Sequence, residues 1–154
     1  MLFLTFRLGQ DRYALDAGQI EAVLPLLAVK ELPGAPAGVA GVIAYRGRPV
    51  PLIDLSLLAL GRSSEALLST RIVLLRYPVA GEGHRLLGLL AEKAVEAVER
   101  DPAEFVATGV EAGTPAYLGP VASDGEGLLQ WVRGEALLPP AIRDILFARL
   151  ADLP

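Results

Sequence analysis

The sequence predicts a mainly β protein, antiparallel and barrel-like, that ends in one helix. Three observations predict this fold class. About ten short segments have the residue pattern of strands and are separated by turns rich in glycine and proline. Residues 71–77 and 85–91 are nearly continuously apolar, which indicates burial on both faces of a strand. After Pro139-Pro140, apolar residues recur mostly three and four positions apart, which is typical of an amphipathic helix.

The N-terminal segments predict a hairpin. Apolar and other residues alternate along 2–8, as on the two faces of a strand, and 12–16 runs back after a turn at 9–11. Residues 17–20 are long enough for a single helical turn, which leads into the apolar segment 22–29.

The next part of the chain predicts a loop, a second hairpin and a short helix. Proline and glycine make 32–36 a loop. Two short strands, 42–45 and 50–55, surround the turn Arg46-Gly47-Arg48-Pro49. A helix at 56–60 follows and is ended by a glycine.

The C-terminal half predicts the central strands, a last hairpin and the terminal helix. The turn at 78–84 joins the two continuous apolar strands, and 94–98 extends the second one. A long loop at 101–115 leads to strands at 117–122 and 128–132. The apolar stripe of the terminal helix is expected to comprise Ile142, Ile145, Leu146, Leu150 and Leu153.

Composition excludes several function classes. The chain has no cysteine and one histidine, His84, so thiolate metal sites, cysteine nucleophiles and paired-histidine relays are excluded. A net charge of −4 disfavours a nucleic-acid partner. The apolar fraction of 53% is high for a small protein and indicates partner interfaces. The N-terminus has no leader pattern, so we expect a cytoplasmic protein without membrane insertion.

Catalytic motifs are missing from the sequence. It contains no phosphate-binding loop, no nucleophile elbow and no H-E-x-x-H. His84 is predicted to be an exposed loop residue, and Trp131 to be a core or seam residue. The sequence therefore favours a binding module over an enzyme. A β-barrel oligonucleotide-binding module and a small enzyme of unrecognised type are the alternatives.

The segment GVIAYRGRPVPLIDL, residues 41–55, resembles the signature of the CheW family of chemotaxis coupling proteins, commonly G-V-x-N-L-R-G-x-x-V-P-V-x-D-L. The positions in register are Gly41, Val42, Arg46, Gly47, Val50, Pro51, Asp54 and Leu55. The flanking segments agree in order, so the resemblance covers roughly residues 2–138. Departures at Ala22, Ala44-Tyr45 and Glu92 indicate a divergent chemosensory pathway, with surface behaviour or cyclic-dinucleotide output in place of flagellar steering.

The resemblance implies a fold and an activity. The fold is a single CheW-like domain over 1–154, with two five-stranded β-barrels packed around an apolar seam. Subdomain 1 would comprise about 15–70, subdomain 2 about 1–14 with 71–138, and a C-terminal helix 139–152. The implied activity is that of a non-catalytic adaptor, without cofactor or metal, that links the cytoplasmic tip of a methyl-accepting chemoreceptor to the regulatory domain of a CheA-type histidine kinase. It would be recruited to receptor arrays.

The candidate contact residues follow from this resemblance and from one hypothesis about Arg46. We expect a carboxylate, that of Asp54 or Glu21, to orient the Arg46 guanidinium at a groove where a receptor helix docks; the alternative is that Arg46 only caps a turn. The expected receptor-binding groove consists of Ile20, Val23, Gly41, Val42, Arg46, Gly47 and Leu90. The expected kinase-binding residues are Asp54, Leu55 and Leu58, with the loop 62–69 beside them.

Overall fold

The computed structural model describes residues 1–81 and 83–151, with side chains placed up to residue 147. The described part contains nine strands: β1 (Leu2–Leu8), β2 (Asp11–Asp16), β3 (Ile20–Leu24), β4 (Val39–Tyr45), β5 (Arg48–Asp54), β6 (Arg71–Val79), β7 (Gly83–Glu99), β8 (Leu118–Asp124) and β9 (Gly127–Val132). The two α-helices there are α1 (Leu55–Leu60) and α2 (Pro140–Ala151). The mainly β fold with a C-terminal helix is confirmed.

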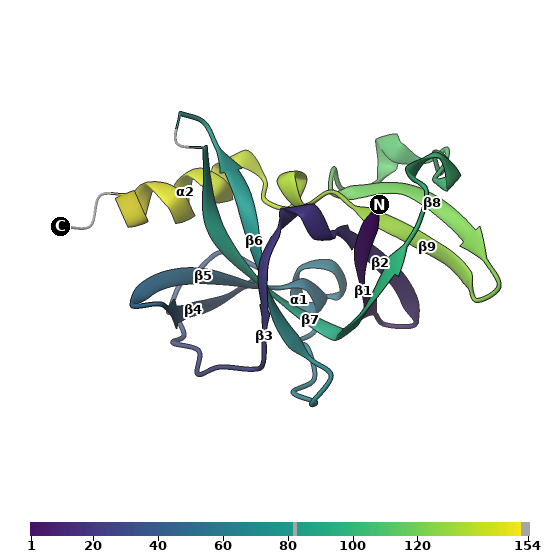
Figure 1. Ribbon diagram of the computed structural model, residues 1–154. Helices are drawn as coiled ribbons and strands as arrows, with labels where there is room; N and C mark the ends of the chain where they lie inside the picture. Colours follow the sequence, from purple (N-terminus) through teal and green to yellow (C-terminus); the bar gives the residue numbers. More distant parts are fainter. Residues whose placement is uncertain (82, 152–154) are drawn as a thin grey trace.

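The strands form two groups that share β7 (Figure 1). The first sheet has the order β3-β6-β7-β5-β4, and the second has the order β7-β1-β2-β9-β8. Most neighbours are antiparallel, as predicted. Two pairs are parallel, β5 with β7 and β2 with β9.

Strand β7 is long enough to belong to both sheets. Its first half pairs with β6 from Val79↔Gly83 to Arg71↔Ala91, and its second half pairs with β1. Between the two halves, one residue of β1 faces residues 93–95 of β7, because Thr5 pairs with Glu96 and Arg7 with Glu92. Lys93 has a φ of 52° at this bulge. A β-bulge bends a strand, and here the bend lies where β7 leaves one sheet and enters the other.

In each sheet, one edge strand forms a single backbone bridge with the chain segment that follows the strand at the opposite edge. Lys30, after β3, pairs with Val42 of β4, and Val106, after β7, pairs with Val121 of β8. Such pairing across the opening of a sheet is what closure of a barrel requires. The division into two five-stranded barrels stays a prediction.

Three apolar clusters fill the molecule, and their arrangement explains the continuous apolar runs. Each sheet has its own cluster on one face, which contains Ile72 and Leu74 in the first sheet and Phe3 and Leu129 in the second. A larger seam cluster lies between the sheets. Along β6, alternate residues face the first-sheet cluster and the seam, with Val73 and Leu75 in the seam. Because both faces of β6 are buried, the expectation of two buried faces for 71–77 is confirmed.

The predicted division between subdomains differs from the strand pairing. Residues 71–79 and 83–91, expected in subdomain 2, belong to the strands β6 and β7 that pair with β3 and β5, and so lie in the first sheet. The sequence marks this boundary only by the charged pair Glu92-Lys93, which ends the continuous apolar run 85–91. The change of sheet occurs inside β7, near Lys93, where neither glycine nor proline marks it.

One smaller expectation changes, and another is confirmed. The turn before β7 is shorter than predicted, so His84 lies within the strand at its exposed end, where it pairs with Pro78. Trp131 packs edge-on against Phe3 and Phe105, with ring centroids 4.9 Å and 5.2 Å away, which confirms it as a packing residue of the second sheet.

Asp124 joins three segments of the second sheet. Its carboxylate accepts hydrogen bonds from Arg12 Nη2 of β2 at 2.6 Å, from the Glu126 backbone N–H at 2.8 Å and from Arg100 Nη2 at 3.2 Å. The hydrogen bond from Arg12, followed by those from Glu126 and Arg100, lowers the pKa of Asp124 to about 2. This carboxylate therefore fastens the β8–β9 hairpin to β2 and to the end of β7.

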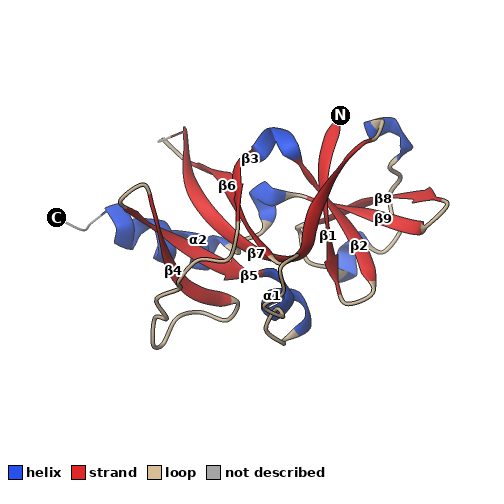
Figure 2. Cartoon of the chain, turned by 60° about the horizontal axis from the view of Figure 1, so that its bottom comes forward, coloured by secondary structure: helices blue, strands red, loops and turns tan. Residues whose placement is uncertain are grey.

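Helix α2 covers the seam beside the first sheet, and α1 lies between the two sheets, in contact with β1, β5 and β7 (Figure 2). Leu146 and Phe147 of α2 are buried in the seam, and the Phe147 ring lies 5.6 Å from that of Tyr77. Ile145, expected in the buried stripe, is 45% exposed. The side chain of Leu150, together with residues 152 and Leu153, lies outside the part of the chain that is described.

Candidate docking site

The predicted signature folds into the β4–β5 hairpin, whose loop consists of two residues. Arg46 and Gly47 have φ angles of 50° and 76°, and two-residue hairpin loops favour positive φ at both positions. Glycine adopts this conformation without cost, whereas arginine does not. The Arg46 guanidinium lies 5.3 Å from the centroid of the Tyr45 ring, within the range of a cation–π interaction.

Neither carboxylate expected to orient Arg46 does so. Among the described residues, Glu21 instead forms an ion pair with Arg76, at 2.7 Å. The register between β3 and β6 brings these two residues together across 55 positions of sequence. Asp54 lies at the other end of β5 and has different partners. The hypothesis of an Arg46–Asp54 or Arg46–Glu21 pair is therefore corrected.

Asp54 is the N-cap of α1 and is only 3% exposed. Its Oδ1 accepts hydrogen bonds from the backbone N–H groups of Ser56 at 3.1 Å and Leu57 at 3.3 Å, which are free donors at a helix start. Ser64 donates twice to the same carboxylate, from its backbone N–H to Oδ2 at 2.9 Å and from its hydroxyl to Oδ1 at 2.6 Å. Asp54 thus fixes both the start of α1 and the loop that follows the helix.

Gly41, also part of the signature, allows two segments to approach closely. A Cβ at this position would lie 2.2 Å from the backbone carbonyl oxygen of Lys30, and its φ is 147°. The backbone of Lys30 forms hydrogen bonds in both directions with Val42, each 2.9 Å long. Only glycine permits this approach, so Gly41 acts on the fold and presents no surface of its own.

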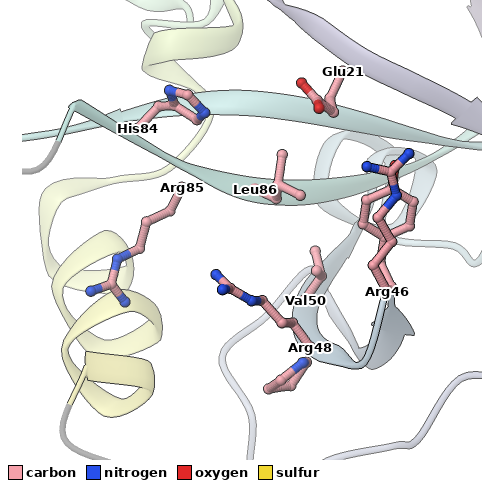
Figure 3. A pocket seen from close by; sticks show the side chains of 9 residues that line it. Glu21, Arg46, Arg48, Val50, His84, Arg85 and Leu86 are labelled. Carbon is pink, nitrogen blue, oxygen red and sulfur yellow. The ribbon is translucent and has the colours of Figure 1, made fainter.

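An open pocket of about 770 Å³ lies beside the Arg46-Gly47 loop. Its polar lining consists of Arg46, Arg48, His84, Arg85 and Glu21. Figure 3 shows Arg48 reaching from the hairpin toward the space in front of β7, while Arg85 extends toward α2. The Arg85 guanidinium donates a hydrogen bond to the Phe147 carbonyl at 3.0 Å.

A second, apolar pocket of about 350 Å³ lies between the loop 32–36 and α2. Val42 and Pro51 of the hairpin and Ile145 and Leu146 of α2 are among its lining residues. Arg46 lines the first pocket and Val42 the second, so the predicted receptor-binding residues do not gather in either of these two pockets.

The other predicted receptor-binding residues occupy different environments. Ile20 packs against the seam and Leu90 against the first-sheet cluster, both half-buried. Val23 is exposed and begins a row of exposed apolar side chains that sequence reasoning did not single out. This row, which we call the β3 surface, consists of Val23, Leu26, Leu27, Val29 and Leu32. Pro25 is the sequence signal for it, because a proline within an apolar run ends a central strand.

The predicted kinase-binding residues are less accessible than expected. Asp54 and Leu55 are buried and Leu58 is half-buried. Exposed apolar side chains lie just beyond them, at Leu60, Leu67 and Leu68, and Leu68 is 93% exposed. We call these three residues the α1-loop surface. The buried residues therefore shape this surface rather than contact a partner themselves.

Within residues 1–81 and 83–151, no three histidine, aspartate or glutamate side chains are placed to hold a metal ion. The same residues contain no helix with the length and apolarity needed to cross a bilayer.

Two sheets thus share one strand around an apolar seam, and exposed apolar side chains form the β3 surface and the α1-loop surface. The chain belongs to the CheW-like domain family, whose model matches residues 2–140. Membership of this family supports a role as a chemotaxis adaptor.

A solved structure shows the same fold. It is the scaffolding protein TtCheW from Thermoanaerobacter tengcongensis, with a TM-score of 0.77 and 19% sequence identity over 90% of this chain and 87% of that one. No curated protein matches the chain.

Proposed function

We propose that this protein is a non-catalytic adaptor that couples the cytoplasmic tip of a methyl-accepting chemoreceptor to a CheA-type histidine kinase, as a divergent member of its family. The proposal places it in the cytoplasm, recruited to receptor arrays. The observation that carries it is the CheW-like fold, on which the exposed apolar side chains of the β3 surface and of the α1-loop surface offer contacts for two partners. An adaptor needs one surface for each partner, since both must bind at once.

The receptor side is assigned to the β4–β5 hairpin and the β3 surface. Arg46 is held in a fixed backbone conformation at the tip of the hairpin, and Val23 and Val42 offer apolar contacts. An amphipathic receptor helix presents apolar side chains at i, i+3 and i+4, which such a surface accommodates. Of the expected groove residues, Gly41, Gly47, Ile20 and Leu90 then support the site through backbone conformation or packing.

The kinase side is assigned to the α1-loop surface. Asp54 positions the loop through its two hydrogen bonds from Ser64, and Leu55 and Leu58 anchor α1 on the seam. Leu68 is the most exposed large apolar residue of the described chain and is the expected contact.

The aromatic residues argue against the oligonucleotide-binding alternative. Single-stranded nucleic acid binds to exposed aromatic rings in a basic groove. Each of the nine aromatic side chains is buried or half-buried, and Phe3, Phe105 and Trp131 pack against one another inside the second sheet.

Two pull-down experiments test the proposal. Arg46→Glu is expected to abolish capture by a receptor cytoplasmic fragment, and Leu68→Glu to abolish capture by a kinase regulatory domain. Arg133→Glu and Val110→Glu, at exposed positions outside both surfaces, serve as matched controls. Thermal midpoints measured in parallel establish that all four variants fold. If Arg46→Glu or Leu68→Glu retains full capture of its partner, the corresponding assignment is incorrect.

A further inference from the structure

The pocket beside the Arg46-Gly47 loop concentrates positive charge on a protein that is negative overall. Three arginines line it, although the whole chain carries a net charge of −4. Its one acidic lining residue among those described, Glu21, is already paired with Arg76. Like charges gathered around one hollow repel each other, and a bound anion relieves that repulsion.

Arg46 and Arg48 carry the argument, because no carboxylate of the described residues pairs with either of them. They flank Gly47 in the hairpin loop, so the turn geometry fixes the spacing of their backbones. A guanidinium offers parallel N–H donors that match the oxygens of phosphate, and His84 adds an imidazole at the opposite edge.

The size and walls of the pocket indicate a ligand larger than a single inorganic anion. Its volume of about 770 Å³ falls in the range of small-molecule sites, ~300–1,000 Å³. The side chains of Tyr45, Val50 and Leu86 give it an apolar portion beside the arginines. A carboxylate on a docked protein helix would contact the arginines at the rim of the pocket and leave the rest of its volume unfilled.

We infer that this pocket binds a small phosphorylated ligand, with its phosphate groups held by Arg46 and Arg48 and the remainder lying against the apolar wall. This site goes beyond the proposed adaptor function and does not depend on it. Nucleotides and inorganic polyphosphate share the required chemistry, and the experiment distinguishes between them.

Calorimetric titration of the full chain with ATP, with inorganic tripolyphosphate and with adenosine tests the inference. ATP is expected to bind, and adenosine, which lacks phosphate, is not. Tripolyphosphate that binds more weakly than ATP identifies a nucleotide site, and equal binding identifies a polyphosphate site. Added salt weakens binding in both cases, since it screens the charges. Absence of binding by both phosphorylated probes at millimolar concentration, or equal binding of adenosine and ATP, overturns the inference.

Arg48 is the residue to vary, because it lines the pocket and, unlike Arg46, is not among the residues named as receptor or kinase contacts. Arg48→Glu is expected to raise the Kd for the phosphorylated probe by about tenfold or more, and Arg48→Lys by less, since lysine keeps the charge without the planar fork. Arg133→Glu changes the net charge by the same amount outside the pocket and is expected to leave the Kd within about twofold. Equal Kd values for Arg48→Glu and Arg133→Glu contradict the inference. Capture of Arg48→Glu by the receptor fragment is measured in a separate pull-down and tests the proposed adaptor function only.

Discussion

Replacing Asp54 by alanine tests whether this residue works as a buried cap or as a contact. The substitution removes the acceptor for four hydrogen bonds, two from the start of α1 and two from Ser64. Loss of an N-cap costs about 1 kcal/mol. Leaving the partly buried Ser64 donors without an acceptor adds about 1–3 kcal/mol. We therefore expect the free energy of unfolding to fall by about 2–4 kcal/mol.

Urea denaturation measures this loss directly. With an m-value of about 2 kcal/mol per molar urea, the midpoint is expected to fall by about 1–2 M. The fluorescence of Trp131, the single tryptophan, reports unfolding from the second sheet, away from the substitution. Ser64→Ala removes only the hydroxyl bond and is the matched control, with an expected loss of about 0.5–1.5 kcal/mol.

The result that refutes this reasoning is an Asp54→Ala variant whose midpoint lies within about 0.3 M of the wild-type value. If that stable variant also fails to bind the kinase, Asp54 acts as a contact residue despite its burial. Loss of kinase binding together with loss of stability is the outcome expected for a cap that holds the α1-loop surface in place.

Three further predictions concern the fold. Gly41→Ala, whose Cβ would lie 2.2 Å from a backbone oxygen, is expected to destabilise the protein by about 3 kcal/mol in urea titrations, whereas Gly113→Ala, with open space around it, changes stability by less than about 1 kcal/mol. The hydrogen bond from Arg12 is the main reason why the pKa of Asp124 is lowered from 3.8 to about 2, so this carboxylate stabilises the fold fully above pH about 4. The thermal midpoint is expected to lose this contribution as the pH falls to about 2. Asp124→Asn is expected to remove that part of the pH dependence. Phe147→Ala is expected to cost about 3 kcal/mol in urea denaturation, and Ile145→Ala, at a position 45% exposed, less than about 1 kcal/mol; equal losses would contradict the observed packing of α2.

Much of the fold could be predicted because its signals are local. Alternation along residues 2–8 and the Arg46-Gly47 turn are each written within a few positions of the sequence, and both are present in the structure. The continuous apolar run 71–77 predicts a strand buried on both faces, and β6 has that property since it separates the seam from the first-sheet cluster.

The candidate site was harder to predict, since it depends on pairings distant in sequence. That Glu21 meets Arg76 rather than Arg46 follows from the register of β3 against β6, which no short segment specifies. The role of Asp54 was accessible in principle. An aspartate before a short apolar helix that a glycine ends is a capping signal, and the structure shows that role for Asp54.

The continuity of β7 has a consequence for how the two sheets can move. Because β7 is hydrogen-bonded into both sheets, neither sheet can rotate relative to the other without breaking strand pairs, and bending is confined to the β-bulge at Lys93. The relative orientation of the two sheets is therefore set by the geometry of β7 at this bulge.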